Sequence, residues 1–361
     1  MITDEFLLQP NIYSTQGKKT LLGLLEEHWI ENVTPGVGDI YILSGFGNYN
    51  GGVRFYDIFK NHIKRGGRVF AMFAGSTSQK LTSKQLVEKL LDCGASVSVL
   101  NRKRIMHAKL FGYKNSNQQT LIVTSGNFTG PGMTQNVEAA IGLSPERVKE
   151  VGFDWENFYG AYHSQDWDLY TPVIPINTAA PEWKLLYDED QRISSKIEEI
   201  EANTMLLMLG HADTVRINAE PGTPESKGSQ YFWLSKDAFD FFPALTIPNA
   251  RGEKPTYSAL VKIKYLDLDN LEDESRVTFE AGNNVDFRLG TGPLRYTKLA
   301  QEGDIAAITR TANAEYDLKI YKQSSEDFKK LEKYMVTFIG HRGKKYGYIP
   351  NETFDQTIKT P

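Results

Sequence analysis

The residues of this sequence that most clearly suggest chemistry lie between Asn101 and Glu138. His107 and Lys109 stand two positions apart within RIMHAKLFGY, a run whose composition predicts a β-strand. Residues two apart in a strand point to the same face, so the imidazole and the ammonium group are expected to project side by side. Together these groups can form a site for a phosphate. The first hypothesis is therefore chemistry on a phosphate ester.

Two later motifs could complete this site. Ser125 and Asn127 end the predicted strand TLIVTSGNF and offer a hydroxyl and an amide beside a flexible glycine. Glu138 stands in the third predicted strand, NVEAAIGLS, and could orient an imidazole and fix its tautomer. Taken alone, a histidine and a lysine two residues apart favour a half-buried strand histidine beside a solvated lysine. The order in which SGN and then a glutamate follow favours a functional site instead.

A second H-x-K, formed by His62 and Lys64, serves as an internal comparison. The surrounding period is helical, and residues two apart on a helix point about 200° apart, so these two cannot converge on one phosphate. Directly before the first pair stand three basic residues, Arg102, Lys103 and Arg104. They fit a solvated loop or contacts to a nucleic-acid backbone, and their closeness to the first pair favours backbone contacts.

The succession HAK, SGNFTG and NVE resembles the phospholipase D superfamily, whose motif is H-x-K, a downstream aspartate, then G-S-x-N and a later glutamate. One departure is clear, because this chain has Lys114 where the family often has the aspartate. The resemblance implies an α/β phospholipase D-like sandwich and gives each matching residue a role. These roles are nucleophile for His107, phosphate ligand for Lys109, polar pair for Ser125 and Asn127, and the carboxylate behind the histidine for Glu138.

The resemblance also implies a reaction that needs no divalent metal and no other cofactor. His107 as neutral imidazole would attack phosphorus and form a phosphohistidine, while Lys109 and Asn127 would hold the phosphoryl oxygens. The family uses two H-x-K segments, whereas this chain supplies one good one. The second histidine must then come from another copy, which implies a two-fold homodimer with one active site at the subunit interface.

The elements around these motifs indicate two domains and a linker. Up to about Ile176, strand-like and helix-like runs alternate, as in an α/β layer fold. The prolines of TPVIPINTAAP disfavour both helix and central strand, so this stretch is expected to be a linker. Farther on, short strands separated by turns predict a small mostly-β barrel. The expected parts are a nuclease and dimerisation domain at 1–170, a linker at 171–194 and a DNA-recognition domain at 195–361.

Eight further segments follow one another along nearly the whole chain: NYNGGVRFY, AGSTSQ, NRKRIMHAKL, SGNFTGPGM, LGHADT, QYFWLSKD, DFRLGTG and GDIAAITR. This succession resembles the BfiI-type metal-independent restriction endonucleases, in which a phospholipase D-like nuclease is fused to a DNA reader. The resemblance implies a B3-like pseudobarrel that grips the major groove of double-stranded DNA with two arms. It also implies a type IIS enzyme of a restriction-modification system, which cuts outside a short asymmetric site.

Two polar segments of the second domain are the predicted arms. Residues 210–237 are expected to form one hairpin with a long polar tip, and residues 281–297 a second hairpin. Their side chains suit base edges, although for any single one a phosphate contact or a plain surface role is more frequent than base readout. The basic stretch HRGKKYG could clamp phosphates. The candidate DNA contacts here are Arg216, Lys227, Gln230, Trp233, Lys236, Asn283, Asn284, Asp286, Arg288, Arg295, Arg342, Lys344 and Lys345.

Composition limits the alternatives. The 361 residues carry 41 Lys plus Arg against 45 Asp plus Glu, so a protein that coats DNA without sequence preference is disfavoured and local basic patches are required. Cys93 is the only cysteine, which excludes an internal disulfide and a thiolate zinc cage. No apolar run approaches the ~20 residues of a membrane span, and MITDEFLLQP lacks a signal-peptide pattern. A cytoplasmic protein without a membrane partner is expected.

Other interpretations stay open at this point. Asp213 with Glu225 and Lys227 formally fits a loose metal-nuclease pattern, but a polar glycine-flanked loop is a poor place for it, and the histidines show no zinc pair. The chain could be a phospholipase D-like phosphodiesterase acting on substrates other than DNA. It could also be a DNA-binding regulator with an inactive nuclease domain, although the intact motif argues against this.

The acidic end of the predicted linker suggests a restraint on cleavage. Carboxylates can occupy a phosphate site lined by Lys109 and the basic patch before it. A solvated acidic tether is the simpler interpretation of the same residues, and the sequence does not decide between the two. The acids concerned are Glu182, Asp188, Glu189 and Asp190.

Overall fold

The computed structural model describes residues 2–9, 20–102, 105–164, 166–190, 203–248, 256–280, 286–339 and 344–359. The chain divides into two compact units, Met1–Asp190 and Gln191–Pro361, which are treated separately below. Within the described ranges, no helix combines the length and the apolar character needed to cross a membrane.

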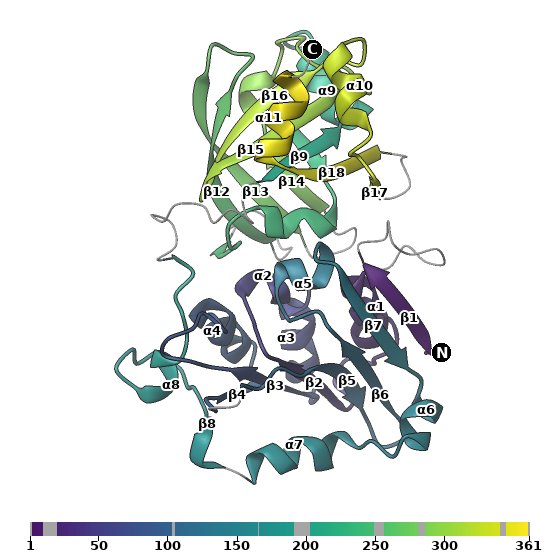
Figure 1. Cartoon of the computed structure of the whole chain (residues 1–361), viewed down its shortest axis with the longest axis vertical. Coiled ribbons are helices and arrows are strands. Elements are labelled where there is room, and N and C mark those ends of the chain that lie inside the picture. The colour runs from purple at the N-terminus through teal and green to yellow at the C-terminus, as the bar shows by residue number, and fades with distance from the viewer. Residues whose placement is uncertain are drawn as a thin grey trace. The chain divides into compact units, whose positions relative to one another are not determined.

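Within the described residues, the first unit forms one sheet of eight strands (Figure 1). The strands β2 (Asp39–Ser44), β3 (Arg68–Ala74) and β4 (Ser96–Leu100) run parallel, and all other neighbouring pairs are antiparallel. β2 is buried along its whole length, as expected of a strand covered on both faces. The order is β1 (Glu5–Gln9), β7 (Glu138–Leu143), β6 (Gln119–Thr124), β5 (Lys109–Lys114), β2, β3, β4 and β8 (Leu169–Tyr170).

Helices cover both faces of this sheet, with α7 on one face and α1, α3 and α4 on the other (Figure 1). One tryptophan from each layer fixes a helix to the strands. Trp29, in a π-helical turn after α1, donates a hydrogen bond to the carbonyl of Gly112 at 3.1 Å, and Trp155 of α7 donates to the carbonyl of Thr120 at 2.8 Å. Both indoles are buried. The helices are α1 (Leu21–Glu26), α2 (Tyr49–Gly52), α3 (Tyr56–Lys64), α4 (Lys84–Asp92), α5 (Gly130–Thr134), α6 (Pro145–Glu150), α7 (Trp155–His163) and α8 (Pro181–Lys184).

The predicted linker differs from the structure over most of its length, because residues 171–190 belong to the first unit. Trp183 of α8 is fully buried, and Leu185 and Leu186 beside it are nearly so. The chain then forms a bridge between Ser83 and Tyr187. Apolar side chains that the prolines obscured in the sequence therefore anchor this segment, while residues 191–194 lie outside the described part.

The second unit is a curled, mostly antiparallel sheet in which β12 and β16 form a parallel pair (Figure 1). Alternating residues such as Phe232, Phe287 and Leu289 face a buried core. The strand order is β10 (Tyr231–Leu234), β14 (Asp286–Gly290), β13 (Leu271–Glu280), β12 (Thr256–Tyr265), β16 (Glu315–Tyr321), β15 (Ile305–Ala312), β9 (Asn203–Met208), β18 (Lys344–Pro350) and β17 (Thr337–Ile339), with β11 (Ile247–Pro248) beside β12.

The predicted arms are built differently from two simple hairpins. Within residues 210–237, the helix α9 (His211–Asn218) and a short 3-10 turn precede β10. Asp213 begins that helix by accepting a hydrogen bond from the backbone N–H of Gly210 at 2.6 Å, and Thr214 and Ile217 bury its inner face. In the second predicted arm, β14 pairs with β13 and β10, and a 3-10 turn follows it instead of a return strand.

Two further helices of the second unit are α10 (Glu326–Glu332) and α11 (Asn351–Lys359). Both contribute to one apolar cluster, through Phe328 and Leu331 of α10 and Phe354 of α11. The α/β architecture predicted for the first domain and the mostly-β architecture predicted for the second are both present.

Candidate active site and DNA-reading face

The predicted catalytic residues gather along one edge of the first sheet. β5 is antiparallel to β2, so the start of β5 meets the end of β2, where Lys109 pairs with Ser44. The end of β6 and the start of β7 meet at the same edge, which brings Ser125 opposite Ala139 beside Glu138. The sequence pattern had placed His107 inside this strand. The strand begins at Lys109, however, so His107 lies two residues before it.

Lys109 and His107 face each other at hydrogen-bonding distance. The Lys109 ammonium nitrogen lies 3.0 Å from both ring nitrogens of His107, and the contact requires an unprotonated nitrogen on the ring. Lys109 is only 7% exposed, whereas His107 is exposed. Burial lowers the pKa of Lys109 below the ordinary lysine value, and the attraction of Glu138 opposes that shift. The pair offers a nucleophile and a cation at one point.

The alternation predicted for this segment is confirmed. Lys109 and Phe111 are buried on the face that carries Trp29, whose ring centroid lies 5.9 Å from that of Phe111. Met106 lies in the apolar cluster of the opposite face, where Ala108 and Leu110 pack against it. The apolar residues between His107 and Lys109 thus fix the direction of the functional pair.

A buried serine ties the loop after β2 to the loop after β6. The Ser44 hydroxyl donates to the carbonyl of Phe46 at 2.7 Å and accepts from the N–H of Phe128 at 2.9 Å. The N–H of Phe46 donates to Oδ1 of Asn127 at 3.2 Å. Because Oδ1 is engaged in this way, the Nδ2 group of Asn127 is the end of the amide that can donate to a phosphoryl oxygen.

Asn48 makes a second tie between the same loops. Its Oδ1 accepts from the N–H groups of Gly51 and Gly130 at 3.1 and 3.0 Å, and its own N–H donates to the carbonyl of Phe128. One asparagine therefore caps the short helix α2 and holds the entry to α5. Together with Ser44 it sets where Asn127 stands.

Two glycines of this edge are required by close approach. A Cβ at Gly45 would lie 2.9 Å from the carbonyl oxygen of Met106 and 3.3 Å from the Cα of His107. A Cβ at Gly126 would lie 2.7 Å from the carbonyl oxygen of Gly132. Any side chain at these two positions would push the His107 segment or the Asn127 loop out of place.

Glu138 is held by neighbours other than the predicted one. Ser125 donates its hydroxyl to Oε2 of Glu138, and the Nδ2 group of Asn136 donates to Oε1 at 3.2 Å. Among the described contacts no hydrogen bond joins Glu138 to His107. The role as the carboxylate behind the histidine stays a prediction, and the described partners of Glu138 are Ser125 and Asn136.

The basic patch before the strand is only partly described. Arg102 forms an ion pair with Asp168 at 2.6 Å, with its guanidinium over the ring of Tyr162, so much of its charge is already compensated inside the unit. Lys103 and Arg104 lie outside the described residues.

The acidic segment after α8 reaches this edge of the sheet without touching Lys109. Asp188 accepts from Gln85 at 2.6 Å, and Glu189 accepts from the backbone N–H of Tyr49, which follows Asn48, at 2.8 Å. Glu182 lies within α8, and the described bond of Asp190 is a backbone N–H donated to Asp188. Asp188 and Glu189 thus bind to α4 and α2, and among the described residues no contact joins the four acids to Lys109 or Arg102.

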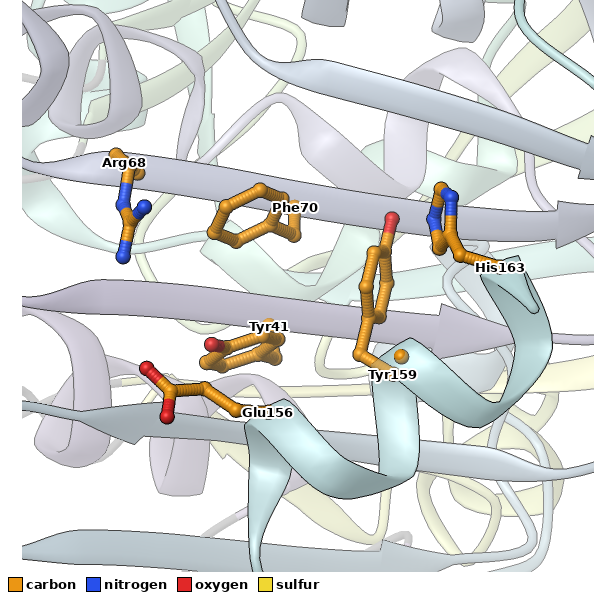
Figure 2. A pocket seen from close by; sticks show the side chains of 7 residues that line it. Tyr41, Arg68, Phe70, Glu156, Tyr159 and His163 are labelled. Atoms are coloured by element: carbon orange, nitrogen blue, oxygen red, sulfur yellow. The ribbon is translucent and has the colours of Figure 1, made fainter.

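A hollow of about 330 Å³ lies on the α7 side of the sheet, away from these residues (Figure 2). Its charged side chains already have partners, since Arg68 pairs with Asp39 at 2.5 Å and Glu156 pairs with Lys114 at 2.9 Å. Tyr41, Phe70, Tyr159 and His163 supply the rest of its wall, and Tyr41 stacks on Trp155. None of the predicted site residues lines this hollow.

In the second unit, β10 and β14 present an aromatic and cationic surface. Tyr231 and Trp233 alternate with the buried Phe232 and Leu234, so they share the outer face of β10. Arg288 stands directly opposite Trp233 in the strand pair. Its guanidinium carbon lies 5.3 Å from the ring centroid of Tyr231 and 5.6 Å from that of Trp233.

Two arginines fix the loop that leads into β10. Arg216, from the last turn of α9, donates Nε to the carbonyl of Lys227 at 2.7 Å, and its guanidinium carbon lies 5.5 Å from the centroid of Tyr231. Arg295 donates to the carbonyl of Ser226. Both were predicted as DNA contacts, and the structure adds that each one also shapes this loop. Lys227 itself is exposed.

Two predicted DNA contacts are corrected because their side chains are used inside the fold. Gln230 is buried and donates to the carbonyl of Asp213 at 2.8 Å. Lys344 is buried, pairs with Asp213 at 2.7 Å and donates to the carbonyl of Trp233. Asp213, considered above for a metal site, is thereby committed to this network.

The remaining candidates fall into three groups. Lys236, in the 3-10 turn after β10, and Lys345 of β18 are partly exposed. For Asp286, at the start of β14, the backbone alone is described. Outside the described residues lie Asn283, Asn284 and Arg342.

Comparison with known families identifies the second unit. Residues 197–360 match a family model described as the DNA-binding domain of the metal-independent restriction enzyme BfiI. The second unit is a BfiI-type DNA-binding domain. This match confirms the resemblance recognised in the sequence. In the same chain, the first unit, which carries the His107 and Lys109 pair, precedes the BfiI-type domain.

Several solved structures are similar to part of this chain. Nuc from Salmonella typhimurium, a phospholipase D family member, is 14% identical with a TM-score of 0.33, over 47% of this chain and 98% of that chain. NucT from Helicobacter pylori is 12% identical with a TM-score of 0.32, over 47% and 99%. Phosphatidylserine synthase from Haemophilus influenzae Rd KW20 is 10% identical with a TM-score of 0.32, over 52% and 42%. No curated protein matches the sequence.

These similarities are too distant to assign an activity. The sheet topology nevertheless confirms the predicted fold classes: the first unit is an α/β sandwich, and the BfiI-type domain is a mostly-β, half-barrel sheet.

Sequence reasoning missed the residues that position the site. Ser44 could have been suspected as the small hydroxyl residue that ends the strand DIYILS, and Asn48 as an asparagine three residues before Gly51. In the BfiI-type domain, Tyr231 could have been found from the alternation YFWL, which turns its ring outward with Trp233.

Replacing Ser44 by Ala should slow cleavage at least tenfold while DNA binding stays unchanged. The variant loses a bond to Phe46 and leaves the N–H of Phe128 without its acceptor, which costs about 1–3 kcal/mol and frees the Asn127 loop. Single-turnover rates and gel-shift affinities measure the two effects. S83A is the matched control, because Ser83 caps α4 by accepting from the N–H of Leu86. It should lower the melting temperature with little change in rate, and an equal rate loss in both variants would contradict a positioning role for Ser44.

Cleavage should decline with rising pH at a lower value than an ordinary lysine would give. Lys109 must be charged to hold a phosphate, burial lowers its pKa, and the rate therefore falls as pH rises through that lowered pKa. K109R should keep whatever rate it has across the same range, because a guanidinium retains its proton to about pH 12. The measurement is the single-turnover rate against pH. An identical alkaline decline in K109R would assign the titration to another group.

Proposed function

We propose that this protein is a site-specific restriction endonuclease that cleaves double-stranded DNA without a divalent metal. The observation that carries the proposal is the joining of a BfiI-type DNA-binding domain, residues 197–360, to a unit in which Lys109 lies 3.0 Å from His107 at the open edge of a sheet. The first part supplies DNA as the partner, and the second supplies chemistry suited to a phosphodiester.

In the proposed reaction, the unprotonated nitrogen of His107 attacks phosphorus, a P–N bond forms and one P–O bond of the DNA breaks. Lys109 and the Nδ2 group of Asn127 bind the phosphoryl oxygens as negative charge accumulates on them. Water then attacks the phosphohistidine, which returns His107 and completes hydrolysis. A metal ion is not needed in this scheme, because Lys109 neutralises the phosphoryl charge.

The leaving oxygen needs a proton. In one copy, His107 is assigned to attack, and Lys109 and Asn127 are assigned to the phosphoryl oxygens. A second copy, related by a two-fold axis, would bring its own His107 to the opposite side of the phosphorus as the acid, and later as the base for water. Val137 and Ile105, which flank Glu138 and His107 in sequence, are 70% and 42% exposed, and a partner would cover them. The proposal is therefore a homodimer with one shared active site.

The division of labour follows from the two units. The BfiI-type domain chooses the sequence, and the nuclease unit cuts where the chain lets it reach, which is the arrangement of a type IIS enzyme cutting beside a short asymmetric site. Such an enzyme of a restriction-modification system would act on DNA in the cytoplasm.

The decisive experiment is incubation of the purified chain with plasmid DNA in EDTA. Discrete fragments with common ends are expected, because neither His107 nor Lys109 requires a metal. Intact DNA would contradict the proposal and favour either a phosphodiesterase for other substrates or a DNA-binding regulator. A lipid phosphodiester assay on the same sample then separates these two.

Replacing His107 by Ala should abolish cleavage, by a factor of at least about 10³, and leave site binding within a few-fold of the parent. The nucleophile belongs to one unit, whereas binding is assigned to the other. Gel shifts with an intact duplex that the parent protein cleaves measure the site binding of H107A. A large loss of affinity in H107A would show that the nuclease unit takes part in recognition.

A fragment of residues 1–190 should sediment as a dimer at concentrations well above micromolar. The structure moves this boundary from Tyr170 to Asp190, because α8 and the segment after it pack into the first unit. V137E should shift the fragment toward monomer and lower its metal-free nuclease activity. V151E, at an exposed position beyond α6, is the control and should do neither. A monomeric parent fragment would contradict the shared active site.

A further inference from the structure

The outer face of β10 and β14 holds its charged groups in a specific way. Arg216 and Arg288 come from elements far apart in the sequence, and each guanidinium lies within 5.5 Å of the same ring centroid, that of Tyr231. Trp233 packs edge-on against Tyr231 with ring centroids 5.2 Å apart, and also contacts Arg288. Tyr231 is thus the one ring among the described contacts that both arginines share.

Besides the ring of Tyr231, a few other groups hold the two arginines. Among the residues that the structure describes, Arg288 has one acidic partner, Glu280 at 3.2 Å, and Arg216 is held by the carbonyl of Lys227. Gly228 follows with a φ of +86°, and a Cβ there would lie 3.3 Å from a terminal nitrogen of Arg216. Arg216 is therefore enclosed between the turn at Lys227 and the ring of Tyr231.

Each arginine keeps donors for a ligand. A guanidinium has five N–H groups, of which one is used in the described bond of Arg216 and one in that of Arg288. Lys227, whose carbonyl accepts from Arg216, is itself exposed. An aromatic face attracts guanidinium groups and restricts their movement, so less conformational freedom is lost when they bind a phosphate.

We propose that Tyr231 is the positioning residue of the DNA-reading face: its ring holds Arg216 and Arg288 in the orientation in which they bind the DNA backbone. The inference rests on the proposed function, since it assumes that this unit binds DNA. It adds that the π-face of Tyr231 sets the affinity through the two cations, without itself contacting a base.

The test compares two Tyr231 variants in the full-length H107A protein, which is expected to bind DNA without cutting it. Y231F keeps the π-face and loses the hydroxyl, whereas Y231L keeps an apolar side chain and loses the π-face. The probe is a short duplex selected from a random-sequence pool by the H107A protein. Dissociation constants are measured over a series of salt concentrations, and melting temperatures verify that each variant is folded.

Y231L should bind about tenfold more weakly than the parent, with the salt dependence of log K reduced by about one to two as phosphate contacts are lost. Y231F should match the parent in both quantities. In a background of R216Q and R288Q, Y231L should have no further effect, because the residues through which Tyr231 acts are gone.

The outcomes separate this inference from the proposed function. If the H107A protein selects no duplex, DNA reading by this unit is wrong. If it selects one and Y231L binds like Y231F, or if Y231L weakens binding equally with and without the two arginines, the positioning role of Tyr231 is overturned while DNA reading stands.

Discussion

The buried ammonium group of Lys109 is the constraint around which the catalytic edge is arranged. A charge on a residue that is only 7% exposed is costly unless other groups compensate it, and the structure supplies a ring nitrogen of His107 at 3.0 Å and the attraction of Glu138. Glu138 is held by Ser125 and Asn136 in turn. This compensation is incomplete, since burial still lowers the pKa of Lys109 against the attraction of Glu138, and an incoming phosphate would complete it.

In both units, buried polar side chains use their hydrogen bonds to hold neighbouring segments together. At the edge of the first sheet, Ser44 and Asn48 form hydrogen bonds with backbone groups of neighbouring loops. These loops hold Asn127 through its Oδ1, so its Nδ2 group is the donor that can bind a phosphoryl oxygen. In the second unit, the buried pair of Asp213 and Lys344 joins α9, β10 and β18. Polar side chains that resemble ligand contacts in the sequence, such as Gln230 and Lys344, can therefore be structural residues that hold neighbouring segments in place.

This explains what the sequence could and could not predict. The strands, their faces and the His107–Lys109 pair follow from local periodicity, because neighbours two apart in a strand share a side. The burial of Gln230 and Lys344, the helix α9 in a predicted hairpin and the attachment of Trp183 to the first unit depend on contacts between distant segments. Likewise, the hydrogen bond from Ser125 to the carboxylate of Glu138 depends on how their two strands pair.

The central claim is that His107 attacks the phosphodiester itself, and trapping the covalent intermediate tests it most directly. Single-turnover reactions with end-labelled DNA in EDTA are stopped with alkali, which preserves phosphohistidine, and the labelled peptide is mapped by mass spectrometry. The account predicts a transient adduct on His107 that is labile to acid and absent from H107A. Cleavage with no adduct at any time, or with the label on another residue, would contradict it.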